Sequence, residues 1–253
     1  FEGNPLFNAG IGATCTVEGT FELDASIMEG KDLSAGAVAG LKHVKHPINA
    51  AYAVKTKSPH VMLSGAGAEE FAKEQGLEMV EDNMYFATPK TMEWIEKLKQ
   101  ESKKNGTVGC VVLDKQGNLT AGTSTGGMFK KRWGRIGDSP VIGAGTYADN
   151  NSCAVSCTGH GEYFIRHAVA FDVCARYKYL KESVEKAADY IIHTELNTNA
   201  GNGGLIAVDK LGNIAMPYNS GGMFRGFLYK EKGSPEIKKG CGIGKKIVVV
   251  GEK

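Results

Sequence analysis

Thr107 is the residue with the clearest chemical potential in this chain. It follows Gly106 and opens an apolar run, Val108 to Leu113, that is typical of a β-strand. A threonine hydroxyl is a weak nucleophile unless a base lies beside it. If the chain were cleaved between Gly106 and Thr107, the new α-amino group, with a pKa of about 8, could accept the hydroxyl proton. One residue would then serve as nucleophile and general base, although a threonine that opens a strand is more often only a good β-former.

Arg135 and Asp138 lie three residues apart in the glycine-containing segment Gly134 to Pro140. The guanidinium of an arginine can bind a carboxylate through two parallel hydrogen bonds, and an aspartate can pair with an ammonium group. Together the two side chains could bind the head group of an α-amino acid. The alternative is a local salt bridge between Arg135 and Asp138 across a turn.

Two further segments carry groups that could support a reaction. The segment Thr123 to Gly127 places three hydroxyl side chains before a Gly-Gly pair. Thr158 and Gly159 come directly before a predicted helix start. Donors at such a loop-to-helix junction can stabilise an oxyanion.

Composition excludes several classes of function. The chain has 253 residues and a formal net charge of +2, so nothing indicates binding to nucleic acid or to a membrane surface. No apolar run approaches the length of a membrane span. We therefore expect a cytoplasmic protein with an ordinary hydrophobic core.

The cysteines and histidines do not follow a metal-binding pattern. There is no C-x-x-C pair, and His160, Glu162 and His167 match no standard zinc helix motif. We therefore expect reduced, mostly buried thiols and no side-chain metal site. The six cysteines are Cys15, Cys110, Cys153, Cys157, Cys174 and Cys241.

The first part of the chain predicts a mixture of turns, strands and short helices. The alternation in Val17 to Met28 predicts a hairpin that turns at Glu18-Gly19. Proline, glycine and capping residues mark the helices, and residues 82–106 read as a charged linker. The predicted helices are Ser34 to Val44, Pro47 to about Thr56, Glu69 to Gln75, and a solvated helix or tether from Thr88-Pro89 to Lys104.

An internal repeat organises the second part. Val112 to Leu119 is echoed by Ala207 to Ile214, and Gly126 to Phe129 is echoed by Gly221 to Phe224. Each copy predicts a strand, a Gly-Asn turn and a second strand, which favours antiparallel hairpins. Between the copies lie two helical patterns, and Lys246 to Val250 predicts a last strand. The helical patterns are Glu162 to Arg176 and Leu180 to Leu196.

Taken together, these segments resemble the plant-type L-asparaginase and isoaspartyl peptidase family of threonine-dependent N-terminal nucleophile hydrolases. The resemblance spans residues 1 to about 224. The matching motifs are LFNAG at 6–10, DASIMEGKDLSAGAV at 24–38, GTVGCVVLD at 106–114, TSTGG at 123–127, GRIGDSP at 134–140, GAGTYAD at 143–149 and TGHGE at 158–162.

The resemblance implies an α/β (α+β) fold, a four-layer αββα sandwich with two packed, mainly antiparallel sheets. It implies one domain in two parts, residues 1–106 as an α-subunit part and residues 107–253 as a β-subunit part that begins at Thr107. Relative to the family pattern, an N-terminal strand and helix are expected to be missing before residue 1. The family also implies a homodimer of cleaved αβ units.

The resemblance also implies a role for each site residue. Thr107 would be the nucleophile, freed by autoproteolysis at Gly106-Thr107, and Thr125 would tune it. The other implied roles are substrate carboxylate and amine binding by Arg135 and Asp138, an oxyanion hole at Thr158 and Gly159, a substrate contact at Gly161, support of Thr107 by Asn8, and a sodium-binding loop formed by the backbone carbonyls of Phe1, Glu2, Asn4, Phe7, Ala9 and Ile11.

The implied activity is hydrolysis of L-asparagine to L-aspartate and ammonia, and of β-aspartyl dipeptides, without an organic cofactor. Two alternatives stay open. The chain could be an uncleaved inactive precursor or truncated pseudoenzyme, or a glycosylasparaginase-like amidohydrolase. The second alternative is disfavoured by Gly127, where glycosylasparaginases typically carry asparagine. The preference between asparagine and isoaspartyl substrates, and any potassium dependence, stay open as well.

Overall fold

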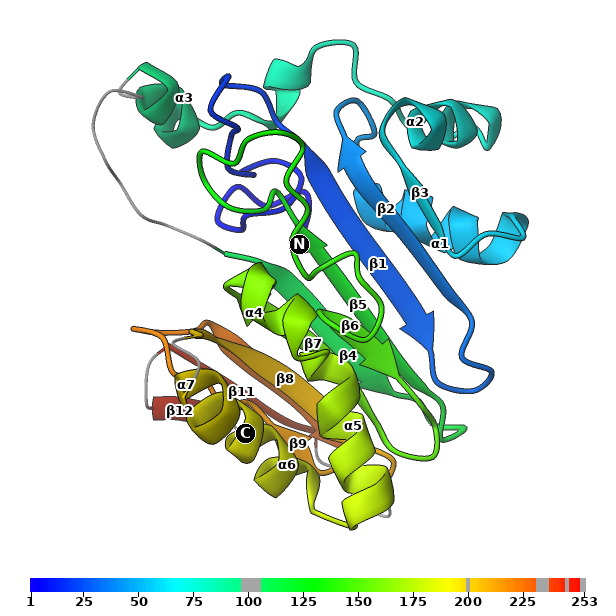
Figure 1. The fold of residues 1–253 in the computed structure, drawn as a ribbon, viewed down its shortest axis with the longest axis vertical. Coiled ribbons are helices and arrows are strands. Elements are labelled where there is room, and N and C mark those ends of the chain that lie inside the picture. Colours follow the sequence, from blue (N-terminus) through cyan, green and yellow to red (C-terminus); the bar gives the residue numbers. More distant parts are fainter. Residues whose placement is uncertain (97–105, 199–200, 231–236, 244–245, 251–253) are drawn as a thin grey trace.

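The chain combines helices with two packed, mainly antiparallel β-sheets, and a third, smaller sheet follows them (Figure 1). The computed structural model describes residues 1–96, 106–198, 201–230, 237–243 and 246–250. The predicted mixed α/β class with antiparallel sheets is therefore confirmed. No helix in these ranges is long and apolar enough to cross a membrane.

The first sheet has five strands in the order β3-β2-β1-β5-β4, and only the β2–β3 pair is parallel. In this sheet Asp24 and Val108 flank the end of β5, where they pair with Thr125 and Ser124. This register brings Thr107, the residue before β4, beside Thr125. The strands are β1 (Leu23–Glu29), β2 (Ala35–Leu41), β3 (Met62–Ser64), β4 (Val108–Leu113) and β5 (Leu119–Thr125).

The second sheet has four antiparallel strands in the order β6-β7-β8-β9. Strands β4 and β5 of the first sheet pack against β7, so the two sheets lie face to face. The strands are β6 (Thr146–Ala148), β7 (Cys153–Gly159), β8 (Gly203–Asp209) and β9 (Ile214–Ala215). A separate antiparallel sheet consists of β10 (Arg225–Lys230), β11 (Ile237–Ile243) and β12 (Lys246–Val250), which confirms the predicted last strand.

Helices pack on both sheets. Figure 1 shows α1 and α2 beside β2 and β1, and α5 and α6 beside the second sheet. In chain order the helical elements are α1 (Pro47–Lys57), α2 (Gly65–Glu74), the 3₁₀ turn Asn83–Phe86, α3 (Pro89–Glu96), α4 (Gly161–Arg166), α5 (Val169–Leu180), α6 (Val184–Tyr190), the π turn Ile191–Glu195 and α7 (Leu196–Thr198).

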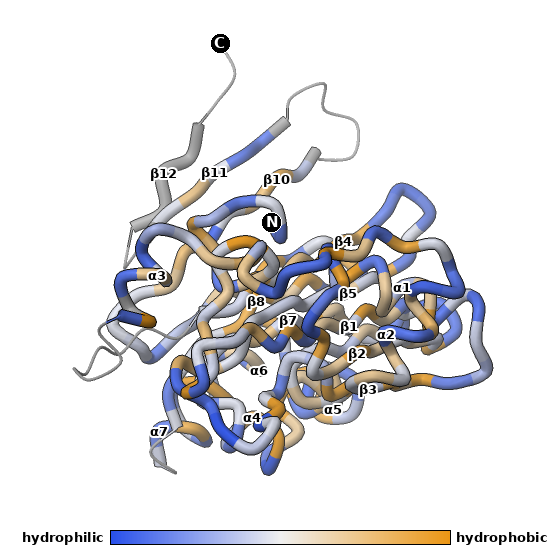
Figure 2. Tube along the Cα trace, turned by 90° about the horizontal axis from the view of Figure 1, so that it is seen from above, coloured by the Kyte–Doolittle hydropathy of each residue, from blue (hydrophilic) through white to orange (hydrophobic). Residues whose placement is uncertain are grey.

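Three clusters of buried apolar side chains hold these elements together. One joins α1 and α2 to the first sheet through residues such as Val38 and Val54. A second, with Leu119 and Ala154, lies between the two sheets. The third joins α5 and α6 to the second sheet and includes Ile191. Figure 2 shows the hydrophobic segments on the central strands and hydrophilic ones at the outer turns.

Part of the interface between the sheets is polar. The Ser26 hydroxyl lies within hydrogen-bond distance of the Ser139 carbonyl, at 2.6 Å, and of Thr146 Oγ1, at 2.8 Å. The Thr146 hydroxyl donates to Thr123 Oγ1 at 2.5 Å, and Thr123 contacts the Ser156 hydroxyl at 2.7 Å. All five residues are buried. This chain of hydroxyls connects β1 and β5 with β6 and β7.

Two predictions for the N-terminal part are wrong. A turn does form at Thr16 to Thr20, but the observed hairpin pairs β1 with β2. The predicted helix Ser34 to Val44 is the strand β2. Its alanines and glycines allow α1 to approach closely, because a Cβ at Gly36 would collide with the backbone of α1 at Ala51. The small side chains therefore reflect a close contact and do not indicate helix propensity.

The remaining helix predictions need smaller corrections. The pattern Glu162 to Arg176 is split into α4 and α5 at Ala168, which adopts a left-handed φ of 46°. The pattern Leu180 to Leu196 starts at α6, where the Ser183 hydroxyl accepts a hydrogen bond from Lys186 N at 3.2 Å.

Other predictions agree with the structure. The helix from Pro47 and the helix start at Thr88-Pro89 are confirmed, and α2 begins four residues before the predicted Glu69. Both repeat hairpins, β4–β5 and β8–β9, are confirmed as well. Residues 97–105 of the predicted tether lie outside the described residues.

The contact at Gly36 predicts a specific loss of stability. Gly36→Ala should lower the free energy of unfolding by roughly 1–3 kcal/mol, because the new methyl group forces α1 away from β2. Gly67 in α2 is the matched control, since a Cβ there meets nothing within 4 Å. Gly67→Ala should stabilise the protein by up to about 1 kcal/mol. Urea denaturation measures both, and equal effects of the two substitutions would contradict this packing.

Candidate active site

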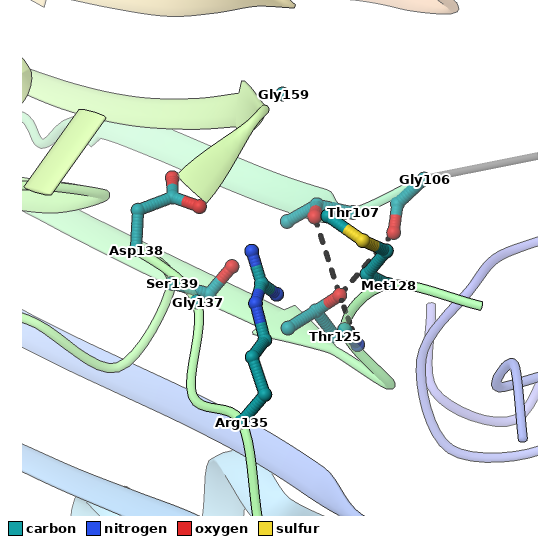
Figure 3. A pocket seen from close by; sticks show the side chains of 10 residues that line it. Gly106, Thr107, Thr125, Met128, Arg135, Gly137, Asp138, Ser139 and Gly159 are labelled. Atoms are coloured by element: carbon teal, nitrogen blue, oxygen red, sulfur yellow. Dashed lines mark hydrogen bonds between the residues drawn. The ribbon is translucent and has the colours of Figure 1, made fainter. Parts of the chain in front are cut away.

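A small pocket lies where the ends of β4, β5 and β7 meet the loop that follows β5 (Figure 3). It brings together residues that the sequence placed up to 53 positions apart, from Gly106 to Gly159. Its lining residues are Gly106, Thr107, Thr125, Gly127, Met128, Arg135, Gly137, Asp138, Ser139 and Gly159.

Thr107 and Thr125 form a short hydrogen-bond chain with Gly106. The Thr107 hydroxyl donates to Thr125 Oγ1 at 3.2 Å, and the Thr125 hydroxyl donates to the Gly106 carbonyl at 3.2 Å. Thr125 Oγ1 also accepts a hydrogen bond from Gly127 N at 2.9 Å. The backbone that follows β5 therefore holds the Thr125 hydroxyl against both Thr107 and the peptide carbonyl that precedes it.

Asn8 connects the N-terminal loop to this arrangement. Its Nδ2 donates to the Gly106 carbonyl at 2.5 Å and to the Gly127 carbonyl at 2.8 Å. Its Oδ1 accepts a hydrogen bond from Thr14 N at 2.7 Å, which fixes the orientation of the amide. The Gly106 carbonyl thus receives two donors, one from Asn8 and one from Thr125, and both draw electron density away from its carbon.

Arg135 pairs with Glu162 rather than with Asp138. Its Nε and Nη2 donate to the two carboxylate oxygens of Glu162, each at 2.9 Å. These hydrogen bonds hold the pKa of the Glu162 carboxyl below its ordinary value. The alternative of a local Arg135–Asp138 salt bridge is therefore wrong for this structure.

Asp138 is buried, and its Oδ2 has no hydrogen-bond partner among the described residues. Burial raises the pKa of its carboxyl from 3.8 to about 7. Gly161 packs against it so closely that a Cβ there would lie 3.0 Å from Asp138 Oδ1 and 2.8 Å from Arg135 Nη2. A buried carboxylate oxygen without a donor is suited to a ligand that brings one, such as an ammonium group.

Thr158 and Gly159 end β7 beside the pocket. Gly159 lines it, and a side chain there would collide with the Asn202 carbonyl and with Gly203 on β8. Thr158 precedes Gly159 on the same strand and is not among the lining residues. The predicted helix start is confirmed, since α4 begins at Gly161, but Thr158 and Gly159 end a strand rather than a loop.

The N-terminal loop, residues 1–12, curls back on itself. Ile11 N donates to the Glu2 carbonyl at 2.9 Å, and Asn4 N donates to the Phe1 carbonyl at 2.9 Å. The Glu2 side chain turns inward, where its Oε1 accepts hydrogen bonds from Ser124 Oγ at 2.6 Å and Ile48 N at 3.0 Å. Sequence reasoning missed this link between the loop and the residue before Thr125.

Other residues near the site were also missed. The buried Lys131 donates from Nζ to the Glu22 carbonyl at 2.8 Å and lies next to Gly127. Met128 lines the pocket, and the echo of Gly-Gly-Met-Phe in both repeats was the only signal for it. His160, Glu162 and His167, considered above as metal ligands, do not form a metal site. His167 pairs with Glu195, and the described residues contain no His/Cys/Asp/Glu cluster suited to a metal.

Comparison with known proteins gives consistent matches. A family model described as asparaginase matches residues 1–237. The isoaspartyl peptidases of Salmonella typhimurium and Escherichia coli are 50% and 45% identical to this chain, over 90% of its length and 77% and 78% of theirs. The human isoaspartyl peptidase/L-asparaginase is 41% identical, over 88% of this chain and 74% of that protein.

The raised pKa of Asp138 predicts a pH-dependent stability. The folded state binds this proton up to about pH 7, whereas the unfolded chain releases it near pH 4, so the contribution of Asp138 to stability is lost as pH rises between these values. Asp138→Asn removes this loss. The variant should gain stability over the unmodified protein by up to about 4 kcal/mol between pH 4 and pH 8. Urea titrations across this range measure the gain, and a difference independent of pH would contradict the assignment.

Proposed function

Since the chain belongs to the asparaginase family, we propose that it hydrolyses the side-chain amide of L-asparagine and the isoaspartyl bond of β-aspartyl dipeptides. The observation that supports the proposal is the hydrogen-bond chain from Thr107 through Thr125 to the Gly106 carbonyl, which lies in one pocket with Arg135 and Asp138. This pocket places a nucleophile beside two charged groups that fit an amino-acid head group.

Maturation comes first in the proposed sequence. The Thr107 hydroxyl attacks the Gly106 carbonyl carbon and the peptide C–N bond breaks as the ester forms. The hydroxyl proton passes to the departing nitrogen, which becomes the α-amine of Thr107. Hydrogen bonds from Asn8 and Thr125 to the Gly106 oxygen support this step, because they stabilise the negative charge that develops there. Water then cleaves the ester and leaves Gly106 with a carboxylate and Thr107 with a free α-amine.

Substrate hydrolysis uses the amine that maturation frees. The Thr107 amine accepts the hydroxyl proton, Oγ attacks the substrate carbonyl, and the amine returns the proton to the departing ammonia or amino acid. Water then releases aspartate from the acyl-enzyme. A positioned base of this kind contributes roughly 10²–10⁴-fold. We assign the oxyanion hole to the Thr158 hydroxyl and the Gly159 N–H, which lie at the end of β7 beside the pocket.

The head group of the substrate is bound by charge. We assign its α-carboxylate to Arg135 and its α-ammonium to Asp138, with Gly161 as a further close contact. The absence of a side chain at Gly161 leaves room beside both charged groups. Because the pKa of free Asp138 is about 7, an incoming ammonium group favours the ionised carboxylate and displaces any proton it holds.

The finer features of assembly are also proposals. We propose that helices, two sheets and helices form four αββα layers, supported by the three apolar clusters. We propose that backbone carbonyls of the N-terminal loop bind a sodium ion, and three of them, those of Phe1, Glu2 and Asn4, also accept hydrogen bonds within the loop. The six free cysteines support a cytoplasmic location. We also propose that the αβ units form a homodimer.

The assignment of Thr107 has a direct test. Thr107→Ala should abolish both cleavage and hydrolysis, because it removes the hydroxyl that we propose attacks in both steps. Thr107→Ser keeps a hydroxyl and should retain part of both activities. Intact mass, N-terminal sequencing and ammonia release from L-asparagine measure the two steps. Hydrolysis that survives in Thr107→Ala would overturn the nucleophile.

The assignment of Arg135 separates binding from maturation. Arg135→Ala should reduce kcat/KM by roughly 10²-fold, mainly through KM, because the substrate carboxylate loses its partner. Self-cleavage should proceed normally, since no head group takes part in it. Arg132→Ala, at an exposed position in the same loop, is the control and should leave kinetics unchanged. An unchanged KM in Arg135→Ala would contradict carboxylate binding.

A further inference from the structure

Glu162 occupies one particular edge of the Arg135 guanidinium. Its two carboxylate oxygens accept from Nε and Nη2, both at 2.9 Å. A planar guanidinium has a second edge formed by Nη1 and Nη2, which also carries two parallel N–H bonds. The pair with Glu162 leaves this second edge available to another carboxylate.

Two glycines keep the second edge accessible. A Cβ at Gly137 would lie 2.8 Å from Arg135 Nη1, and a Cβ at Gly161 would lie 2.8 Å from Nη2. Any side chain at either position would fill the space beside this edge. Figure 3 shows the guanidinium directed into the pocket, between Asp138 on one side and Thr107 and Thr125 on the other.

We propose that Glu162 is a positioning residue: it holds Arg135 by the Nε–Nη2 edge and so presents the Nη1–Nη2 edge to the substrate α-carboxylate. This role rests on the proposed function. Glu162 is not itself a lining residue of the pocket; it contacts the lining residue Arg135 and acts through it.

The placement of Glu162 fits positioning better than a role in stability. Its side chain is 52% exposed, so solvent screens the ion pair and limits what even this two-point contact contributes to folding. Glu162 also balances the charge of Arg135, so the site does not bind every anion equally well. A ligand then needs both a carboxylate for Arg135 and an ammonium for Asp138 to bind well.

The kinetics of Glu162 variants test this role. Glu162→Ala should raise KM for L-asparagine by about tenfold while kcat stays within about twofold, because only the orientation of Arg135 is lost. Glu162→Gln, which keeps one acceptor oxygen, should give a smaller rise. Glu185 holds the corresponding first-turn position of α6 away from the pocket, so Glu185→Ala is the matched control and should change neither constant.

A double-mutant cycle shows whether Glu162 acts through Arg135. In an Arg135→Lys background, Glu162→Ala should add no further rise in KM, because lysine has no guanidinium edge for Glu162 to orient. Self-cleavage and the thermal midpoint should match those of the unmodified protein in every Glu162 variant. An unchanged KM in Glu162→Ala, or additive effects in the cycle, would overturn the positioning role alone. Failure of the unmodified protein to cleave itself or to hydrolyse substrate would overturn the proposed function and this role with it.

Discussion

The site depends on the hydroxyl chain that joins the two sheets. Ser26 and Thr123 from the first sheet meet Thr146 and Ser156 from the second, and Ser26 also holds the Ser139 carbonyl. Each hydroxyl can donate one hydrogen bond and accept others, so these buried groups serve as hydrogen-bond partners for one another. Because Ser139 follows Asp138, this chain of hydroxyls fixes the loop that carries Arg135 and Asp138 at the junction of both sheets.

The hydroxyl chain between the two sheets restricts which residues can lie next to it. Gly109 of β4 has to lack a side chain, because a Cβ there would collide with Ser156 Oγ. Charged groups are buried nearby at a cost: burial raises the pKa of the Asp24 carboxyl and lowers that of the Lys131 ammonium. Lys131 offsets part of this cost through the Glu22 carbonyl and the nearby charge of Asp24. Groups with perturbed pKa values cluster at functional sites, so these buried charges mark the region as a candidate site.

Helix starts and hairpin turns could be predicted from the sequence, because a few neighbouring residues determine them. Pro47 and Thr88-Pro89 marked helix starts, and the Gly-Asn turns marked both hairpins. The prediction of a helix for Ser34 to Val44 was wrong because the alanines and glycines of this segment allow α1 to pack closely on it. Sequence periodicity does not reveal such a packing partner. The same limit applies to the site. Residue types indicated Arg135 and Asp138 as head-group binders, but the pairing of Arg135 with Glu162, 27 residues away, follows only from the fold.

The two proposed head-group residues are held in opposite states before any ligand binds. Arg135 is already paired, whereas the Oδ2 of Asp138 has no donor among the described residues and burial raises the pKa of this carboxyl to about 7. A ligand with a carboxylate alone gains only the contact with Arg135 and leaves the Asp138 carboxyl neutral or unpaired. A ligand that also carries an ammonium group converts Asp138 to its ionised form and gains a buried charge pair. Selectivity for an amino-acid head group would therefore arise from the burial of Asp138 as much as from the number of contacts.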